Sequence, residues 1–381
     1  MNISFGKQVR KMSVVTGYSY SENANEIASE IAQKINNRPN TILFFSPVSV
    51  FEELTVKMRE FFPESDIYGV TTNYSFFENR KCSTEYGPGT IAIAFGDSFK
   101  CVGGVIEEII LHPTEFAPAV KRSAELIPEK NTVCLSFTTA FYGSEELILD
   151  TLACAIGDKK IPVAGSSCGN EKWDRTTFVS HNGRVFCAAS IYLFVHNKKG
   201  RITVLKQDMF VPMRTEFRAT SVDVRKRMIY ELDGKPAAMQ LAKVLHYELY
   251  EMWDHLGEYG LGRMIGNEIY TTDFAGITKD KALEMFASVY GGSRLCLLER
   301  SKHNACLSDI IAAIRLNNPH PRFVLYINCM SLTKFYQEIK WLNVFSVGMG
   351  TLSPCYAGMS GYGEQLGRIN INKTLMAIAF E

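Results

Sequence analysis

The stretch TVCLSFTTAFYGSEELILDTLACAIGDKKIPVAGSSCGN, residues 132–170, contains the pattern that decides the fold. It opens with the apolar run TVCLSF (132–137), continues into SEELILDTLACAI (144–156) and ends with IPVAGSSCGN (161–170). A short apolar run bounded by turn residues predicts a strand, and apolar residues at spacings of three and four predict a helix. The stretch therefore predicts a unit of strand, small polar residue, helix, strand and glycine-rich turn.

The same unit occurs twice more in the chain. One copy begins with TILFFS (41–46) and reaches DIYGVTTN (66–73), and the other runs from FVLYINC (323–329) to WLNVFSVGMG (341–350). A further strand, entered from a turn, follows each copy: GPGTIAIAFG (87–96), NGRVFCAASIYLF (182–194) and NKTLMAIAF (372–380). We therefore predict a mixed α/β (α+β) fold of layered sheets and packed helices, built from repeated strand-helix-strand-hairpin units.

A basic stretch that contains proline, KKGRITVLKQDMFVPM (198–213), separates the second and third copies. The chain has 381 residues, which is too long for one ordinary core. We expect two domains, residues 1–200 and residues 215–381, with a boundary between residues 198 and 225.

The composition excludes some classes of partner. The 41 Lys and Arg residues nearly balance the 40 Asp and Glu residues, so no basic surface for nucleic acid is expected. The longest charge-free apolar stretch, VFCAASIYLFV (185–195), is too short to span a membrane, and the first residues lack an apolar signal segment. We expect a cytoplasmic protein with no membrane partner, whose ten cysteines are reduced because the chain is long and has no secretion signal.

The stretch GMSGYGEQLGRI (358–369) surrounds one carboxylate, Glu364, with four glycines. The glycine spacing is one residue longer than a dinucleotide fingerprint, and strand-like alternation follows it, which predicts a bend between strands. Such a bend would hold Glu364 at a rim, with Tyr362 on the same side as an aromatic wall. The carboxylate could then bind a ligand amine; the alternative is an exposed acid in a surface turn.

Three candidate ligand-binding side chains follow the first strand of their units: Ser46, Ser136 and Cys329. Side chains at strand ends are held by a rigid sheet and are accessible in the loops that follow. The alternative for the two serines is a helix N-cap, and for Cys329 it is a buried free thiol.

A second candidate group, Thr71, Thr72 and Gly165-Ser166-Ser167, occupies equivalent places in the first two units. A glycine followed by hydroxyl groups can present backbone N–H groups to an anion such as a carboxylate. The alternative is a turn whose hydroxyls are satisfied within the protein.

Several segments resemble one family of sensory domains. YELDGKPAAMQLAKVL (230–245), LYINCM (325–330) and YAGMSGYGEQLGRININKTLMAIAF (356–380) resemble the C-terminal half of FIST domains. DIYGVTTNYSFF (66–77) and IPVAGSSCGNEKWDRTTFVSHNGRVF (161–186) are similar to the N-terminal half. The resemblance implies that the two expected domains are a FIST N-like and a FIST C-like sensory half.

The resemblance further implies a non-catalytic, bacterial-type cytoplasmic sensor that takes part in signal transduction. The implied ligand is an amino-acid-like metabolite, and no cofactor or metal is expected. The implied signalling partner is a histidine kinase, a chemoreceptor or a cyclic-dinucleotide enzyme.

Two alternative functions remain open. Some FIST proteins resemble haem-binding nitric-oxide sensors, and His246 is the candidate ligand because Met239, Ala242, Tyr250 and Trp253 share its predicted helical stripe. A hydrogen-bonded core histidine packed between sheets is the other interpretation of that stripe.

A cysteine-dependent enzyme is the second alternative. Cys329 as a nucleophile would need a base such as His303 or His320. The chain contains no G-x-S-x-G, H-E-x-x-H or kinase loop, which argues against catalysis.

Overall fold

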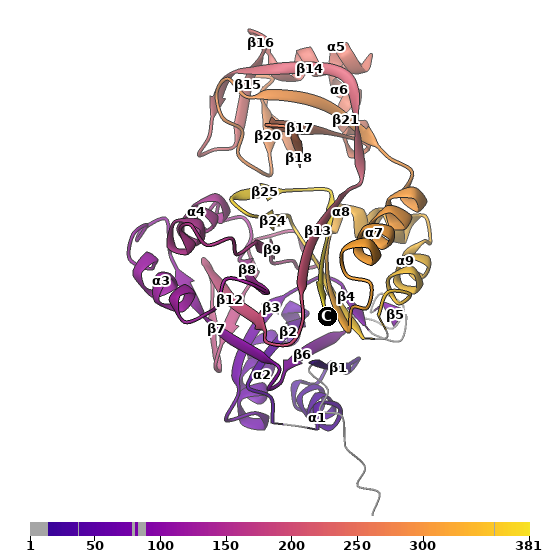
Figure 1. Cartoon of the computed structure of the whole chain (residues 1–381). Coiled ribbons are helices and arrows are strands. Elements are labelled where there is room, and N and C mark those ends of the chain that lie inside the picture. Colours follow the sequence, from indigo (N-terminus) through magenta and orange to yellow (C-terminus); the bar gives the residue numbers. More distant parts are fainter. Residues whose placement is uncertain (1–13, 37, 78–80, 83–88, 354) are drawn as a thin grey trace, which may run out of the picture.

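The computed structural model describes residues 14–36, 38–77, 81–82, 89–353 and 355–381 (Figure 1). Three units with the same order of elements form its body. The first unit comprises β1 (Val14–Ser19), α1 (Ala24–Ile35), β2 (Thr41–Ser46), α2 (Val48–Phe61), β3 (Asp66–Thr71), β4 (Ser75–Phe77), β5 (Lys81–Cys82) and β6 (Thr90–Phe95). In each unit a helix connects two parallel strands, as the apolar patterns predict.

The other two units repeat this order. The second comprises β7 (Phe99–Glu107), α3 (Ala117–Glu125), β8 (Thr132–Thr138), α4 (Glu145–Ile156), β9 (Val163–Ser167), β10 (Val179–His181), β11 (Arg184–Phe186) and β12 (Ala189–Asn197). The third comprises β13 (Ile202–Asp208), α7 (His303–Asn317), β22 (Phe323–Cys329), α8 (Met330–Glu338), α9 (Leu342–Met349), β23 (Tyr356–Gly361), β24 (Glu364–Leu366), β25 (Ile369–Ile371) and β26 (Thr374–Phe380).

The units exchange their hairpins in a cycle. The three sheets have the orders β1-β6-β2-β3-β10-β11, β7-β12-β8-β9-β24-β25 and β13-β26-β22-β23-β4-β5. The β4–β5 hairpin of the first unit therefore completes the third sheet, β10–β11 completes the first sheet, and β24–β25 completes the second. Because every sheet needs a hairpin from another unit, the three sheets form one body.

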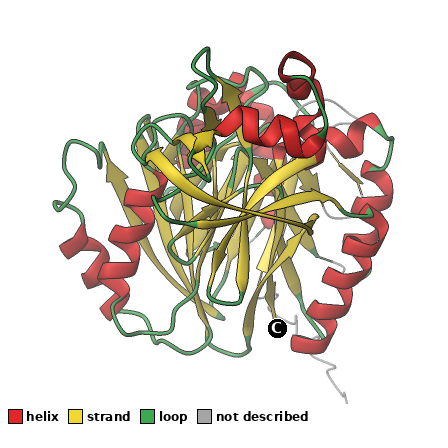
Figure 2. Ribbon diagram, turned by 90° about the horizontal axis from the view of Figure 1, so that it is seen from above, coloured by secondary structure: helices red, strands yellow, loops and turns green. Residues whose placement is uncertain are grey.

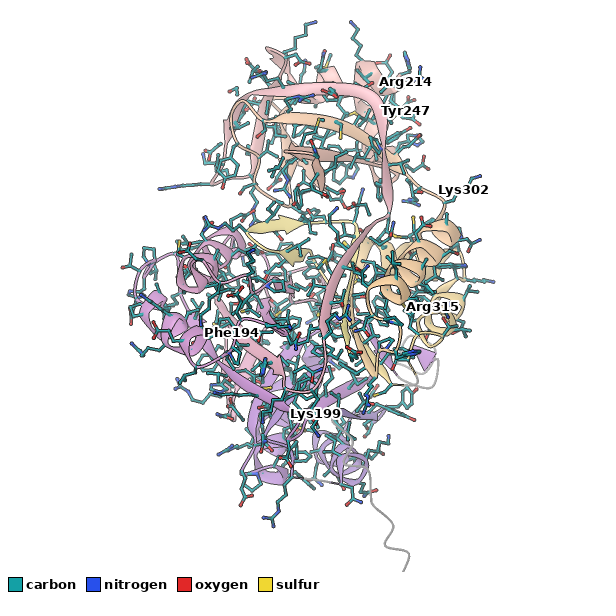
Figure 3. All side chains as sticks on the ribbon, viewed as in Figure 1. Phe194, Lys199, Arg214, Tyr247, Lys302 and Arg315 are labelled. Carbon is teal, nitrogen blue, oxygen red and sulfur yellow. The ribbon has the colours of Figure 1, made fainter. Side chains whose placement is uncertain are left out.

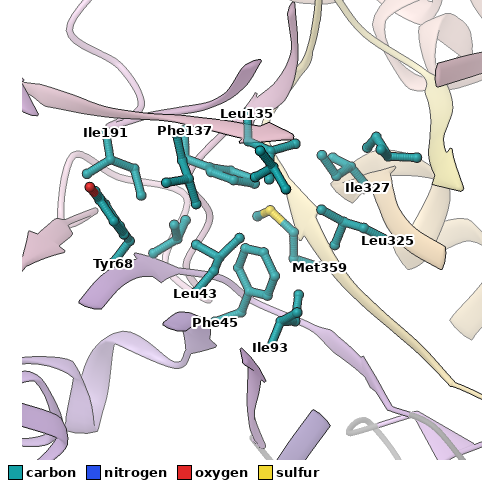
Figure 4. Close-up of a cluster of buried hydrophobic side chains, with 14 of the residues drawn as sticks. Leu43, Phe45, Tyr68, Ile93, Leu135, Phe137, Ile191, Leu325, Ile327 and Met359 are labelled. Carbon is teal, nitrogen blue, oxygen red and sulfur yellow. The ribbon is translucent and has the colours of Figure 1, made fainter. Parts of the chain in front are cut away.

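All three sheets share one apolar core. Alternate side chains of β2, β8 and β22 point into it: Leu43 and Phe45, Leu135 and Phe137, and Leu325 and Ile327 (Figure 4). The intervening side chains face the helices of their own unit, so each sheet is covered on its outer side. Strands lie in the middle and helices around the outside (Figure 2). Figure 3 shows the side chains on this framework, with buried Phe194 in the second unit and exposed Arg315 on α7.

A second body is inserted into the third unit, between β13 and α7 (Figure 1). Its sheet has the order β18-β17-β21-β14-β15-β20-β19, with β16 beside β15, and it has its own apolar core. Its elements are β14 (Phe210–Asp223), β15 (Met228–Leu232), β16 (Lys235–Pro236), α5 (Ala237–Leu245), α6 (Leu249–His255), a 3-10 helix (Leu256–Glu258), β17 (Tyr259–Ile265), β18 (Glu268–Thr272), β19 (Phe274–Ile277), β20 (Leu283–Met285) and β21 (Arg294–Arg300). We call this body the inserted domain.

The predicted mixed α/β fold of repeated units is confirmed, with three local corrections. WLNVFSVGMG (341–350) contains helix α9, and the strand that pairs in parallel with β22 is β23 instead. The stretch 198–213 contains β13, which pairs with β26 in the third sheet. The predicted stripe through His246 is broken, because α5 ends at Leu245 and His246 has a left-handed backbone with φ of 59°.

The division into residues 1–200 and 215–381 stays a prediction. The prediction concerns which segments fold independently. The order of strands in the sheets shows only how the strands pair, so it does not test this prediction. The exchanged hairpins β4–β5 and β24–β25 cross this boundary in opposite directions.

We predict that Gly165→Ala destabilises the body by about 3 kcal/mol or prevents folding, because overpacked interiors cannot relax around a new atom. A Cβ at position 165 would lie 1.7 Å from the carbonyl oxygen of Ser136. The matched control is Gly291→Ala, whose new Cβ would meet nothing closer than 3.7 Å. Urea denaturation of both variants checks this, and equal midpoints would contradict the close approach of β8 and β9.

Candidate functional site

A cleft of about 530 Å³ lies between the inserted domain and the body. The inserted domain contributes Trp253, Asp254, Leu256, Gly257, Asp273, Phe274, Ala275 and Phe286. The third unit contributes Cys329, Met330, Ser331, Lys334, Tyr362 and Asn372, and the second contributes Trp173. Segments that are far apart in the sequence therefore form one concave surface, as is usual for small-molecule sites between domains.

The N-terminus of α8 lies at this cleft. β22 ends at Cys329, and α8 begins directly at Met330 without a side-chain cap. The Cys329 Sγ is 3.3 Å from the Oγ of Ser331, which also lines the cleft. Uncapped N–H groups of a first helical turn favour a negatively charged ligand group.

Tyr362 forms an aromatic wall of the cleft with Trp173. Their ring centroids are 5.0 Å apart, and the ring planes are inclined by 36°. The Tyr362 hydroxyl donates to Asn170, whose carbonyl and Oδ1 oxygens both lie at 2.6 Å, and accepts the Trp173 N–H at 3.1 Å. Burial raises the pKa of Tyr362. The hydroxyl is therefore committed to the 170–174 loop, and the ring is what a ligand would meet.

Glu364 lies in the protein interior. It is fully buried in β24, where it pairs with Ser166 of β9 and Ile371 of β25. Its Oε2 accepts hydrogen bonds from the Thr374 N–H at 3.1 Å and hydroxyl at 2.7 Å. In the described part of the chain its Oε1 has no hydrogen-bond partner. The expected position at a rim, on the same side as Tyr362, is therefore wrong, because β24 is an inner strand of its sheet.

Burial raises the pKa of Glu364 to about 8, although hydrogen bonds from Thr374 and Cys329 act in the opposite direction. Burial, followed by the charge of Glu364, raises the pKa of the Cys329 thiol. A thiol with a raised pKa is a poor nucleophile. Among the described residues, no hydrogen bond joins Cys329 to a histidine. His303 packs instead on Trp341, with ring centroids 4.7 Å apart, and His320 is exposed.

The other predicted hydroxyls lie at buried strand junctions. The Ser46 Oγ accepts a hydrogen bond from Thr90 at 3.1 Å, and the Thr71 Oγ1 donates to the Phe178 carbonyl at 3.2 Å. The Thr72 Oγ1 donates to the Ser360 carbonyl at 2.9 Å. None of these three lines the cleft. Ser46 therefore bonds within its own unit, whereas Thr71 and Thr72 bond to segments of the second and third units.

Ser136 and the Gly165-Ser166-Ser167 turn are also internal. Ser136 lies inside β8, which continues to Thr138, so its predicted place at a strand end is wrong. The Ser166 Oγ donates to the Gly363 carbonyl at 2.8 Å, and the Ser167 Oγ donates to Glu145 at 3.3 Å. Neither Ser46 nor Ser136 caps a helix, because the N-cap residues of α2 and α4 are Pro47 and Ser144.

His246 lies away from the cleft. It is exposed beyond the end of α5, and its predicted neighbours Met239 and Tyr250 are 43% and 79% exposed. No group of three or more His, Cys, Asp or Glu side chains that could hold a metal occurs in the described residues. Of the stripe, only Trp253 reaches the cleft.

Lys373 joins the two walls of the cleft. Its ammonium group lies 2.7 Å from the Asp273 carboxylate and donates to the carbonyl of Tyr259, both in the inserted domain. Lys373 is 2% exposed, and burying its ammonium group without these partners would cost free energy. The neighbouring Asn372 also crosses the boundary, because its Oδ1 accepts the Asp273 N–H at 3.2 Å. These bonds fix the position of the inserted domain over α8.

Of the predicted ligand-binding residues, Cys329 and Tyr362 line the cleft, but most of the residues that line it were not predicted. Trp173, Asp254, Asp273 and Lys334 were not candidates, because no local pattern shows that residues 209–301 fold over the third unit. One available signal was the sequence CMSLTKF (329–335), where Lys334 follows Cys329 by five residues on a helix.

Comparison of the sequence with known protein families identifies the class of protein. The family model of the FIST N domain matches residues 40–235, about half of the chain. The chain therefore belongs to the FIST family, whose domains are sensory. No curated protein sequence matches it. Within the described residues, every helix is too short or too polar to cross a lipid bilayer.

We predict that Glu364→Gln flattens the pH dependence of stability. A carboxyl whose folded pKa is raised to about 8 holds its proton more tightly when folded, so wild-type stability falls as the pH rises from about 4.5 to about 8. This group contributes a slope of at most about 1.4 kcal/mol per pH unit. Gln keeps the oxygen that accepts from Thr374 and cannot ionise.

Urea midpoints of wild type and Glu364→Gln between pH 5 and pH 8.5 test this prediction, since all other groups cancel in the difference. The variant should gain relative stability steadily as the pH rises. Parallel profiles would show that Glu364 titrates normally.

Proposed function

We propose that this protein is a cytoplasmic, non-catalytic sensor that binds a small amino-acid-like metabolite in the cleft beside α8. The cleft itself carries the proposal: it is concave and aromatic, and it is built from both bodies of a sensory-family protein. Its volume of about 530 Å³ lies within the range of sites for small ligands.

The charges in the cleft favour a zwitterion. Asp273 is neutralised by Lys373, whereas Asp254 and Lys334 form no ion pair or hydrogen bond within the described residues. One carboxylate and one ammonium group are therefore available, together with the uncapped first turn of α8. An α-amino acid presents the complementary pair of charges.

A ligand in this cleft would contact the inserted domain and the body together. Binding would then favour one arrangement of the two bodies over others, in proportion to the difference in affinity. We propose that this change is transmitted to a histidine kinase, a chemoreceptor or a cyclic-dinucleotide enzyme. The exposed surface of the inserted domain is available for such contacts.

Neither alternative function gains support from the geometry. His246 as a haem ligand would have to act from an exposed helix end outside the cleft. Cys329 as a nucleophile lacks an adjacent histidine among its described contacts, and its pKa is raised. Both would require an arrangement different from the one observed.

We predict that at least one amino acid or amino-acid-like metabolite raises the melting temperature in a thermal-shift screen. A ligand at 100 times its Kd stabilises the folded state by about 2.7 kcal/mol. Lys334→Met should reduce this shift, whereas Lys243→Met, an exposed lysine on α5 outside the cleft, should preserve it. A screen with no shift, or equal shifts in both variants, would contradict the proposed site.

A further inference from the structure

We propose, building on the function above, that the ligand carries a methylated ammonium group, held against aromatic rings of the cleft. The relevant class is a carboxylate that bears a trimethylammonium group, as in betaine-type derivatives of amino acids.

Five aromatic side chains line the cleft: Trp173, Trp253, Phe274, Phe286 and Tyr362. They come from the second unit, the inserted domain and the third unit, so they meet only in the folded protein. Trp173 is 43% exposed and Trp253 is 48% exposed. Large rings left half exposed around a cavity are surfaces that a ligand would cover.

The ring wall is fixed in place by hydrogen bonds. Asn170 holds the loop that carries Trp173: its Oδ1 accepts the N–H groups of Lys172 at 2.9 Å and Trp173 at 2.8 Å. The Nδ2 of Asn170 donates to the Asp174 carboxylate at 2.8 Å. The Tyr362 hydroxyl is bound to Asn170 as well, and its ring, which is 8% exposed, packs on Trp173, so the half-exposed Trp173 ring is held in place before a ligand arrives.

The polar groups near these rings suit a cation that donates no hydrogen bonds. A primary ammonium needs up to three acceptors. Yet the Asn372 Oδ1 already accepts from the Asp273 N–H, and the Asp273 carboxylate is paired with Lys373. Among the described residues that line the cleft, Asp254, next to Trp253, is the one carboxylate without an ion pair or hydrogen bond to the described part of the chain. Aromatic faces with one carboxylate attract a substituted ammonium through charge and cation–π interaction.

Lys334 determines the other end of the ligand. An ammonium group in the same cleft repels a simple cation, but it favours a molecule that also carries a carboxylate. The complete lining therefore selects a zwitterion whose positive end is methylated.

Isothermal titration calorimetry with the full chain tests this inference. The probes are glycine betaine and 4-trimethylammoniobutanoate, each with the isosteric carboxylate in which a neutral tert-butyl group replaces the trimethylammonium group, and with its unmethylated amine. We expect at least one trimethylammonium probe to bind roughly tenfold more tightly than both of its analogues, because only it combines charge with apolar methyl groups. Trp173→Leu and Asp254→Asn should each weaken that binding roughly tenfold.

Tyr250→Leu is the matched control, since Tyr250 is 79% exposed on the same helix as Trp253 and does not line the cleft. Its affinity should equal that of the wild type. Equal binding of a probe and its tert-butyl isostere, or tighter binding of the primary amine, overturns the inference.

The two proposals can fail separately. If an unmethylated amino acid binds in a way that depends on Lys334 while neither trimethylammonium probe binds, this inference is wrong and the proposed function stands. If neither class binds, both are contradicted.

Discussion

The junction between β24 and β9 is the constraint on which both the fold and the site depend. There the Gly363 carbonyl accepts hydrogen bonds from the Ser167 N–H and the Ser166 hydroxyl, each at 2.8 Å. A Cβ at Gly361 would lie 1.9 Å from the Ser166 Oγ, so only glycine allows this approach. The junction buries Glu364 in the second sheet and leaves Tyr362, two residues earlier, at the cleft. One exchanged hairpin thus places Glu364 inside the sheet and Tyr362 at the cleft.

Buried charges fix the position of the inserted domain. Arg227 donates to Glu145 and Glu146 of α4, each at 2.6 Å, and Lys373 pairs with Asp273 on the other side of the boundary. Arg263 reaches the Asn370 carbonyl, and burial lowers its pKa to about 10. Desolvation offsets much of the attraction in such pairs, but an unpaired buried charge would be costly, so they specify orientation more than they add stability. That orientation places Asp254 and Trp253 opposite Lys334 and Tyr362.

The repeated units could be predicted from sequence because their signals are local. Strands such as β2, β8 and β22 are buried on both faces and therefore appear as continuous apolar runs. The exchange of hairpins could not be predicted, since β4, β10 and β24 pair with strands of other units. The predicted position of Glu364 at a rim was wrong for the same reason. The glycines correctly indicated a bend, but the burial of Glu364 depends on pairing with β9, almost two hundred residues earlier. Trp173 and Lys334 were missed for that reason, because their meeting is a property of the assembled body.

Tryptophan fluorescence tests whether a ligand binds between the inserted domain and the body. Of the three tryptophans, Trp173 and Trp253 line the cleft, while Trp341 is buried among the helices of the third unit. The compound that stabilises the protein most should change the emission of the wild type in a saturable titration. In the Trp173→Phe, Trp253→Phe double variant, which retains only Trp341, we expect this change to disappear. A full response from Trp341 alone, or no response in the wild type at saturation, would show that the ligand does not bind between the two bodies.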